Sequence, residues 1–439
     1  MTNCTKKAIE FTPISRKKVL ASFCGGSITS NAGILLFREI DQELGLSKRI
    51  AALIPDSRNP LQIEHSVLTM IKQRVFGIGL NYEDLNDHTH LRGDECFKIG
   101  AGVEKDLASA PTLCRFENSI KQETLGRLNA LLLDIFIEHY GNRPPKEIII
   151  DFDGTDFFTH GEQEQSHFNT YYDHECFMPL YAFCGDHLLG VLLRPSSVDG
   201  AHHAWGLFAT LYKRIRAKWP KTRIVFRGDG GFCRESMLRW CDKKEIPYIV
   251  GMAKNAILMR AASKAIEKAK KQYEADPRET VRVYEQFEYA AKSWKGKRTM
   301  VARVEYNHHG ANVRFIATNM EGHSSNLYGN VYCQRGDMEN RIKQQKLDLR
   351  AGRVSCHLFT SNAFRVLLSG FAYVLLTHLK LKYLKRSKLK NAYVGTIRAK
   401  LLKIGAVIVK NTRRIKIMMD SHFPEQDLFT GVAQALHPS

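Results

Sequence analysis

The chain has 439 residues, of which 44% are hydrophobic and 25% charged, so it can bury a large core and has the composition of neither a disordered nor a membrane protein. Its 65 lysines and arginines outnumber its 45 aspartates and glutamates, which gives a formal charge of +20. An enzyme acting on small metabolites would not need such a charge. We therefore expect a polyanionic partner, as in nucleic-acid-processing, ribosomal or membrane-surface proteins.

Targeting and membrane signals are missing from the sequence. The ten cysteines show no zinc-ligand spacing, and we expect them to be reduced thiols of a cytoplasmic protein. The first 18 residues lack the apolar core of a signal peptide. The longest apolar stretch begins at Val366, but small and polar residues interrupt it before the roughly 20 residues that a membrane span requires. We predict a buried helix there and no membrane association.

Residues 1–140 carry apolar side chains at helical spacing and are predicted to be helical. Within them, Ser109 and Pro111 fit the start of a helix that would project Arg115 outward. Such a helix suits a helix-turn-helix reader of DNA, and an ordinary capped helix fits the same residues equally well.

Strand signals begin after a linker-like break at residues 142–147. Five core strands are predicted, with helices at about 200–219 and 233–244 between the later ones: 147–153, 178–184, 187–194, 223–229 and 247–253. This order indicates a mixed sheet with helices on its faces. Residues 254–325, with a charged helix and three strand-like runs, are interpreted as a β-rich insertion, and the chain becomes helical and basic again from Tyr332.

The segment IIIDFDGTDFF, residues 148–158, places Asp151 and Asp153 at the end of an apolar strand. It resembles the DxDGT nucleophile motif of haloacid-dehalogenase-type phosphatases. Such a phosphatase also needs a later lysine and an acidic pair, whereas FRGDGGF supplies Asp229 with no second acid before Glu235. That fold further requires DxDGT on the first strand of a parallel sheet, which the three consecutive predicted strands contradict. The phosphatase is kept as an alternative.

A group of four polar residues follows the insertion. In YCQRGDMENRIKQQK, Tyr332, Arg335, Glu339 and Lys346 have offsets of 0, 3, 7 and 14 residues. On a regular helix these positions fall within an arc of about 60° and span about 21 Å. A solvated charged face would explain any one of them. All four together, after two strand-end aspartates, favour a site.

The spacing Y-x2-R-x3-E-x6-K resembles the signature of DDE transposases of bacterial insertion sequences, in the cut-and-paste, hairpin-forming group. Residues 147–350 are also similar to the DDE transposase domain of one branch of that group. The resemblance implies an α/β, ribonuclease-H-like mixed sheet with flanking helices. Its implied parts are a helical DNA-end-binding domain at 1–140, a catalytic core at 147–253 and 326–360, the β-rich insertion at 254–325 before the glutamate helix, and a basic helical C-terminal region at 361–439.

The resemblance also implies the catalytic residues. Asp229 and Glu339 match the family's acids, and the first acid is Asp153 or, as the alternative, Asp151. We prefer Asp153, because the family's ligand lies close to a threonine, as Asp153 does to Thr155. Two strand-end aspartates and a helix glutamate can hold two divalent ions about 3.5–4 Å apart. Mg²⁺ suits an all-carboxylate set, and we expect Mn²⁺ to substitute for it.

The expected partners are double-stranded DNA, both transposon ends and target, and a second copy of the chain in a synaptic homodimer. Tyr332, Arg335 and Lys346 are expected to contact phosphates beside the cleaved bond. Trp294, among cations in the insertion, would stack on a flipped base or lie in the core of the sheet. The stretch Lys380–Lys416 holds thirteen lysines and arginines and no acid, which favours contact with the DNA backbone. A catalytically inactive DNA-binding regulator is the other alternative.

Overall fold

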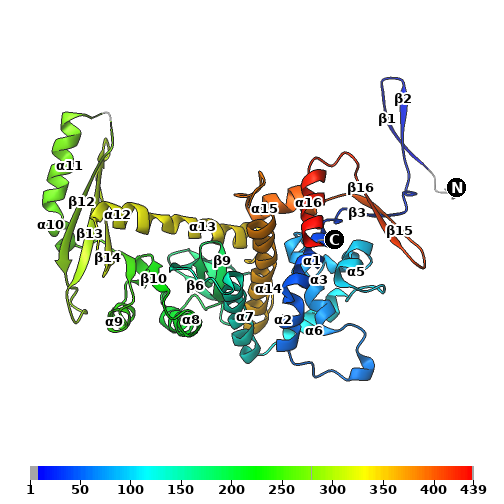
Figure 1. Cartoon of the computed structure of the whole chain (residues 1–439), viewed down its shortest axis with the longest axis horizontal. Coiled ribbons are helices and arrows are strands. Elements are labelled where there is room, and N and C mark those ends of the chain that lie inside the picture. Colours follow the sequence, from blue (N-terminus) through cyan, green and yellow to red (C-terminus); the bar gives the residue numbers. More distant parts are fainter. Residues whose placement is uncertain (1–7, 278, 438–439) are drawn as a thin grey trace. The chain divides into compact units, whose positions relative to one another are not determined.

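The computed structural model describes residues 8–277 and 279–437, which form two compact units (Figure 1). The first unit contains the chain up to Ser119, together with Asp348–Arg350 and the chain from Phe371 onward. The second contains Ile120–Leu347 and Ala351–Gly370. The sequence predicts separate terminal regions at 1–140 and 361–439, whereas in the structure most of both regions belongs to one unit.

The first unit is mainly helical. Its helices are α1 (Ile34–Leu44), α2 (Leu46–Leu53), α3 (Val67–Gly79), α4 (His88–Leu91), α5 (Glu95–Ala101), α6 (Ala110–Asn118), α15 (Val394–Ile397) and α16 (Gln426–Leu436), with short helical turns η1 (Pro60–Gln62), η6 (Leu379–Tyr383) and η7 (Arg398–Leu402). Helix α3 is buried on nearly all sides and forms the centre of this unit.

Strands in the first unit were not predicted. Strands β1 (Ile9–Ile14) and β2 (Lys17–Ala21) pair only with each other. Strands β3 (Ser27–Thr29), β15 (Ala406–Lys410) and β16 (Ile415–Met419) form a second small sheet. The expectation of wholly helical terminal regions is therefore wrong in these segments. The alternation of buried and exposed side chains that reveals a strand in a sequence is weak here, because most of these residues are exposed.

An eight-stranded sheet organises the second unit, in the order β12-β13-β14-β11-β10-β4-β8-β9. Its strands are β4 (Glu147–Gly154), β8 (Leu180–Cys184), β9 (His187–Leu192), β10 (Arg223–Gly228), β11 (Tyr248–Met252), β12 (Val281–Tyr289), β13 (Arg298–Asn307) and β14 (Gly310–Thr318). Two neighbouring pairs in this sheet, β4–β10 and β10–β11, are parallel, and its other neighbouring strands are antiparallel. The antiparallel meander β4-β8-β9 followed by two parallel crossovers is the ribonuclease-H-like arrangement, which confirms the predicted fold, and the five core strands match their predicted bounds within two residues.

The β-rich insertion continues this sheet instead of forming a separate module. Strand β14 pairs antiparallel with β11, so β12, β13 and β14 extend the core sheet at that edge. Helices α10 (Ala256–Ala261) and α11 (Ser263–Ala275) cover one face of the extension. One hydrophobic core runs under both the insertion and the catalytic sheet, because α7 (Gln122–Tyr140), α8 (Ala204–Lys218) and α9 (Glu235–Lys243) cover the same face.

The opposite face carries the glutamate helix, which is one almost continuous run from Ser324 to Asp348. Its parts are α12 (Ser324–Asn326), the π-helical η3 (Leu327–Tyr332), the 3₁₀ turn η4 (Cys333–Arg335), α13 (Gly336–Lys343) and the π-helical η5 (Gln344–Asp348). Leu327 and Tyr328 pack on Ile249, Val301 and Ile316 of the sheet. This packing lays the helix across the face to which Asp151 and Asp153 point.

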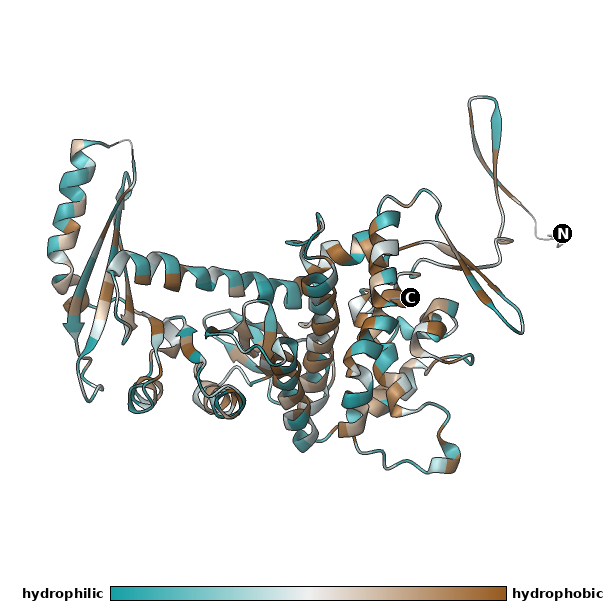
Figure 2. Cartoon of the chain, viewed as in Figure 1, coloured by the Kyte–Doolittle hydropathy of each residue, from teal (hydrophilic) through white to brown (hydrophobic). Residues whose placement is uncertain are grey.

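The last long helix, α14 (Phe359–His378), contains the apolar stretch that begins at Val366. It is largely brown in Figure 2, and with η6 it is long and apolar enough to cross a membrane. However, 83% of its most apolar 18 residues are buried. A core helix accounts for this pattern, as predicted. The remaining strands of the second unit, β5 (Phe157–Phe158), β6 (His167–Asn169) and β7 (His174–Phe177), form a small sheet after β4.

Candidate active site

Two aspartates lie at the carboxyl ends of adjacent parallel strands. Asp153 is the penultimate residue of β4, and Asp229 directly follows β10. The register pairs Asp151 with Arg227 and Phe152 with Gly228, so the next step along both strands brings Asp153 beside Asp229. Burial raises the pKa of Asp153, and at this separation the negative charge of Asp229 adds to the rise.

Asp151 is engaged in a buried ion pair. Arg227 donates from Nε to its Oδ1 (2.5 Å) and from Nη2 to its Oδ2 (2.7 Å). Arg227 also donates to the backbone carbonyl of Val331 in the glutamate helix. Burial raises the pKa of Asp151, and the hydrogen bonds from Arg227 oppose that rise. With both carboxylate oxygens bonded to Arg227, Asp151 ties the strand to its neighbour and to the helix, which favours Asp153 as the first catalytic acid.

Arg335 connects the strand acids to the glutamate helix. Its Nη1 donates to Asp153 Oδ2 (2.7 Å), and its Nη2 donates to Glu339 Oε1 (3.0 Å). Burial raises the pKa of Asp153 to about 6, where Arg335 lowers it and the charges of Asp229 and Glu339 raise it further. The three predicted acids therefore converge on one place, with a guanidinium between two of them.

A divalent cation fits the chemistry of this place. Three carboxylates that repel one another need positive charge, and carboxylate oxygens are the ligands that Mg²⁺ prefers. Arg335 already supplies one positive charge between Asp153 and Glu339. Across residues 8–277 and 279–437, no three acidic, histidine or cysteine side chains are already arranged to enclose an ion. Arg335 would compete with such an ion for Asp153 Oδ2 and Glu339 Oε1.

Tyr332 lies against the loop that carries Asp229. A Cβ atom on Gly251 would come within 2.6 Å of Tyr332 Oη, so only glycine permits this approach. The ring of Tyr332 also packs edge-on against Tyr328, with 5.4 Å between centroids. Burial raises the pKa of Tyr332, and the charge of Asp229 also raises it. Tyr332 therefore keeps its proton and presents a hydroxyl beside Asp229.

Lys346 reaches the same edge of the sheet through a residue that sequence reasoning missed. Its Nζ lies 2.7 Å from Asp156 Oδ1, and His174 Nε2 lies 3.2 Å from Asp156 Oδ2. Although burial opposes it, the hydrogen bond from Lys346 holds the pKa of Asp156 below its usual value. The signal was present as the third acid of DFDGTDF, three residues after Asp153.

Of the two roles considered for Trp294, its surroundings favour packing in the sheet. Strand register aligns the acid-bearing ends of β4, β10 and β11 with the β13–β14 hairpin, whereas Trp294 lies in the β12–β13 turn at the opposite edge. Its ring packs edge-on against Tyr289, and the guanidinium of Arg298 lies 5.3 Å from its centroid. Arg298 is itself buried between Glu235 and Asp242. Trp294 is therefore part of the sheet's packing, the second of the two roles considered for it.

Arg115 lies where the sequence places it. Helix α6 begins after Ser109 with Pro111 in its first turn, and the side chain of Arg115 is exposed. Ser109 Oγ, however, bonds to Thr112 Oγ1 (3.1 Å), and Arg115 donates to the same Thr112 oxygen (3.2 Å). DNA contact by Arg115 stays a prediction.

The basic stretch Lys380–Lys416 is only partly available to a ligand. Lys382 pairs with Glu43, Lys388 with Glu425 and Lys410 with Glu95. Lys403 donates to Asn31 (2.9 Å), and the buried Arg398 donates to the backbone carbonyls of Gly79 and Asp348 and to Asn81 Oδ1. These contacts stabilise the first unit and engage five of the thirteen cations. Contact of the stretch with the DNA backbone stays a prediction.

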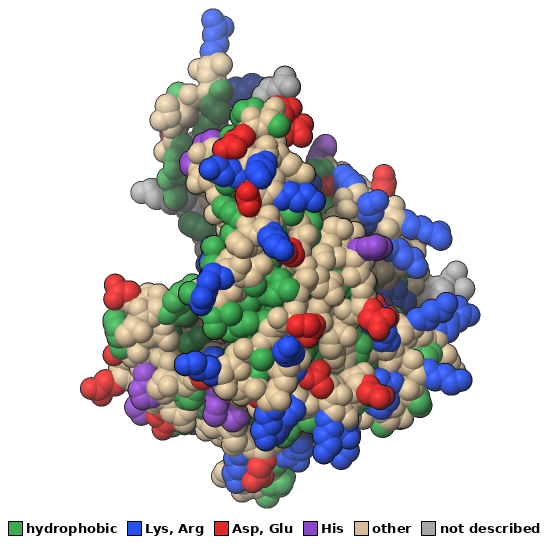
Figure 3. Space-filling view, turned by 90° about the vertical axis from the view of Figure 1, so that its left-hand side faces the viewer, with side chains coloured by type: hydrophobic (Ala, Val, Ile, Leu, Met, Phe, Trp, Pro, Cys, Tyr) green, Lys and Arg blue, Asp and Glu red, His purple; other side chains and the backbone are tan. Residues whose placement is uncertain are grey.

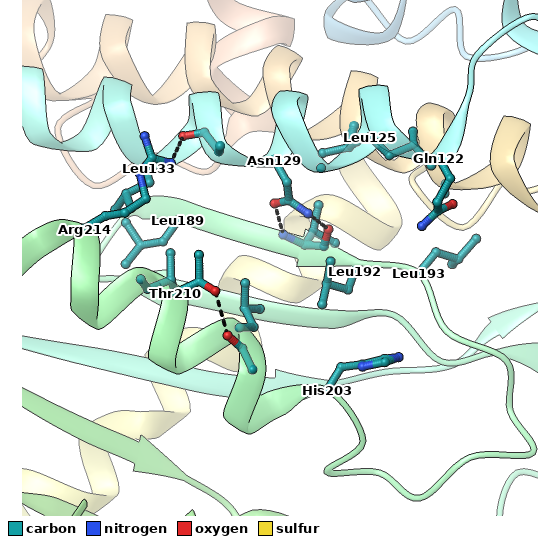
Figure 4. Close-up of a pocket in the computed structure, with 18 of the residues that line it drawn as sticks. Gln122, Leu125, Asn129, Leu133, Leu189, Leu192, Leu193, His203, Thr210 and Arg214 are labelled. Atoms are coloured by element: carbon teal, nitrogen blue, oxygen red, sulfur yellow. Dashed lines mark hydrogen bonds between the residues drawn. The ribbon is translucent and has the colours of Figure 1, made fainter. Parts of the chain in front are cut away.

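Two other surfaces of the second unit lie apart from the candidate acids. A cavity of about 370 Å³ lies between α7, β9, α8 and α14, and leucine is the commonest residue in its lining (Figure 4). Asn129 lies in its wall, where its Oδ1 accepts from the backbone N–H of Val191 in β9 and its Nδ2 donates to the carbonyl of the same residue. None of the three candidate acids lines the cavity. Figure 3 shows blue cations interspersed with red acids on the side of α11, where Lys271 pairs with Glu267 and Lys270 with Glu274. Neither this surface nor the cavity contains the candidate acids.

The chain matches a known protein family over nearly its whole length. The sequence model of the family described as transposase DDE domain, group 1, matches residues 11–439. No curated protein matches the chain. Among solved structures, the Mos1 transposase paired-end complex with left transposon end is similar at 11% sequence identity and a TM-score of 0.18, over 51% of this chain and 73% of that chain. The chain belongs to the DDE transposase family.

Proposed function

We propose that this transposase binds the terminal inverted repeats of an insertion sequence, cleaves both DNA strands and joins the ends to target DNA, with Asp153, Asp229 and Glu339 as its catalytic acids. The observation that carries the proposal is the position of Arg335 between Asp153 and Glu339, beside the strand end that carries Asp229. A solvated charged face would not bring three carboxylates from two strands and a helix together.

Each group has a defined task in phosphoryl transfer. Mg²⁺ or Mn²⁺ held by the three carboxylates would activate the attacking oxygen and stabilise the leaving oxygen. Before DNA binds, the positive charge of Arg335 offsets the repulsion between Asp153 and Glu339. Its guanidinium can then donate two hydrogen bonds to a DNA phosphate. Lys346, held by Asp156, presents its ammonium to a neighbouring phosphate. Tyr332 presents its hydroxyl as a hydrogen-bond donor beside Asp229.

The test is metal-dependent cleavage of a duplex that carries the element's terminal repeat. Asp229→Asn and Glu339→Gln should each lower cleavage by at least about a thousandfold, because a neutral amide loses the charge that holds the ion. Asp337→Asn, in the same helix, is the matched control and should cleave as the wild type does. Binding of the duplex and the melting temperature should be unchanged in all three variants.

The outcomes separate the candidate functions. Full cleavage by Asp229→Asn or Glu339→Gln would refute the assignment of the acids. Duplex binding without cleavage by the wild type, with either metal, would favour the inactive DNA-binding regulator. Hairpin ends on a denaturing gel would support the cut-and-paste route through a hairpin, and a two-to-two complex of protein and DNA ends would support a synaptic homodimer. The phosphatase is no longer a candidate, because β4 begins an antiparallel meander.

A further inference from the structure

The hairpin β1–β2 of the first unit is exposed along nearly its whole length. It pairs with no other strand, and every residue of the two strands is exposed except Val19, which is half-buried. Large apolar side chains stand open to solvent: Phe11 is 53% exposed, Ile14 71% and Leu20 60%. A lone two-stranded hairpin is marginally stable in water, so contacts with a ligand would stabilise this one.

The cations of the hairpin gather at its tip. Arg16, Lys17 and Lys18 follow the turn at Ser15, whose φ of 57° makes the chain reverse tightly. Glu10 is the only acid between Ile9 and Ala21. It lies 3.4 Å from Lys18, but both side chains are more than half exposed, so water screens this pair and leaves Lys18 available.

A second ribbon in the same unit has the same construction. Strands β15 and β16 are joined by a turn in which Asn411 Oδ1 accepts from the backbone N–H groups of Arg413 (3.0 Å) and Arg414 (2.8 Å). The Arg413 and Arg414 side chains are exposed, as is Lys416 on the following strand. The first unit therefore has two β-ribbons whose turns present exposed positive charge, which suits an anionic ligand.

We propose that the β1–β2 hairpin is a DNA-binding arm that lies in the major groove of the transposon end, with Arg16, Lys17 and Lys18 on phosphates and Phe11 and Ile14 toward the base edges. The groove, about 12 Å wide, admits a two-stranded ribbon, and apolar side chains contact the methyl groups of thymine there. A second copy of the chain is the poorer occupant, because it would press three cations against a protein of charge +20.

This proposal rests on the proposed function, and its test keeps the two apart. The probe is a labelled duplex carrying the terminal repeat, titrated with protein between 50 and 300 mM salt. Replacing Arg16, Lys17 and Lys18 together by alanine should weaken binding about ten- to a hundredfold and flatten the salt slope by about 2 to 3, near 0.9 per lost phosphate contact. The matched control replaces Lys264, Lys268 and Lys271 of α11 by alanine, removes the same charge, and should bind within about twofold of the wild type.

Hydrogen exchange of the wild-type protein supplies a readout that does not depend on a variant. Amides of Ile9–Ala21 should exchange rapidly in the free protein and slow at least tenfold with the terminal duplex. Phe11→Ser with Ile14→Ser should reduce the preference for the terminal repeat over random duplex, with little change in salt slope.

Three outcomes would overturn the arm. The tip variant could bind as tightly as the wild type, with the same salt slope, while both cleave; the proposed function would then stand without the arm. The hairpin amides could become protected without DNA as protein concentration rises, which would make a second copy the occupant. A wild-type protein that binds no DNA would remove the proposed function, and the arm with it.

Discussion

Arg335 performs at the residue scale the role that a metal ion performs in a loaded site. It balances the negative charge of Asp153 and Glu339. Burial raises the pKa of Asp153 to about 6, and the charge of Arg335 opposes that rise. The same guanidinium suits a phosphate, so DNA and metal can displace it from the carboxylates together. We predict that this exchange couples DNA binding to assembly of the metal site.

Trp294 gives a prediction that separates packing from DNA contact. Trp294→Ala should lower the free energy of unfolding of the second unit by about 2–3 kcal/mol, because it removes the ring between Tyr289 and Arg298. Nicked and hairpin products should fall together. The matched control is Trp205→Ala on α8, whose ring is 49% exposed and which should cost less than about 1 kcal/mol. A selective loss of hairpin ends at unchanged stability would return Trp294 to a role in base stacking.

Some residue assignments could not be made from the sequence. Asp151 and Asp153 are two residues apart on one strand and share a face, so the pattern of side chains cannot rank them. Their difference comes from Arg227, which the register places opposite Asp151. Arg227 lies two residues before Asp229, just as Asp151 lies two residues before Asp153. Once the two strands are taken as neighbours, this shared spacing predicts the pair of Asp151 and Arg227. Partners 76 positions apart in the chain are otherwise invisible to local patterns.

At the scale of elements, the second unit was predictable because its strands are buried on one or both faces and its helices are amphipathic. The glutamate helix was predicted as regular, and its two π-helical segments were not. They alter the positions of Tyr332 and Lys346 around the axis, yet both still reach the acid-bearing edge, through Gly251 and Asp156. Irregular turns of this kind recur at functional sites.

A buried polar network joins three helices of the first unit and makes its stability depend on pH. Arg74 of α3 donates to Glu117 of α6 (2.6 Å) and contacts His88 Nε2 of α4 (3.0 Å). Burial and the charge of Arg74 hold the pKa of His88 well below 6.5. The folded state therefore keeps His88 neutral, whereas the unfolded chain binds a proton below about pH 6.5. The stability that this difference contributes is complete above pH 6.5 and is lost as the pH falls below it.

His88→Gln should be less stable at pH 7.5, because Arg74 loses a partner, and should show a weaker loss of stability between pH 6.5 and 5. One proton corresponds to at most about 1.4 kcal/mol for each pH unit in that window. All four tryptophans lie in the second unit, so exchange of the α3 amides is the appropriate measurement. An unchanged pH dependence in the variant would show that other groups cause it.

At the scale of the whole molecule, the sequence gives the net charge of +20 directly, but it does not show which cations are paired and which are exposed. Cations in Lys380–Lys416 that pair with Glu43, Glu95 and Glu425 stabilise the first unit, and those acids are far away in the sequence. Their neighbours Lys385, Arg386, Lys390 and Lys400 are exposed, and in the part of the chain described here they have no ion pair. Spacing alone cannot separate the two groups, because both occur in one basic run.

Two variants with equal change in charge should distinguish these groups. Four exposed cations, Lys385, Lys390, Arg413 and Arg414, replaced by alanine should flatten the salt slope of DNA binding by about 3 to 4 with little change in melting temperature. Four engaged cations, Lys382, Lys388, Lys403 and Lys410, should instead lower the melting temperature and leave the slope of the folded protein nearly unchanged. Both variants lose four positive charges, so net charge cannot explain a difference between them. Equal flattening by both would mean that the long-range field of the molecule, rather than contact by particular side chains, attracts the DNA.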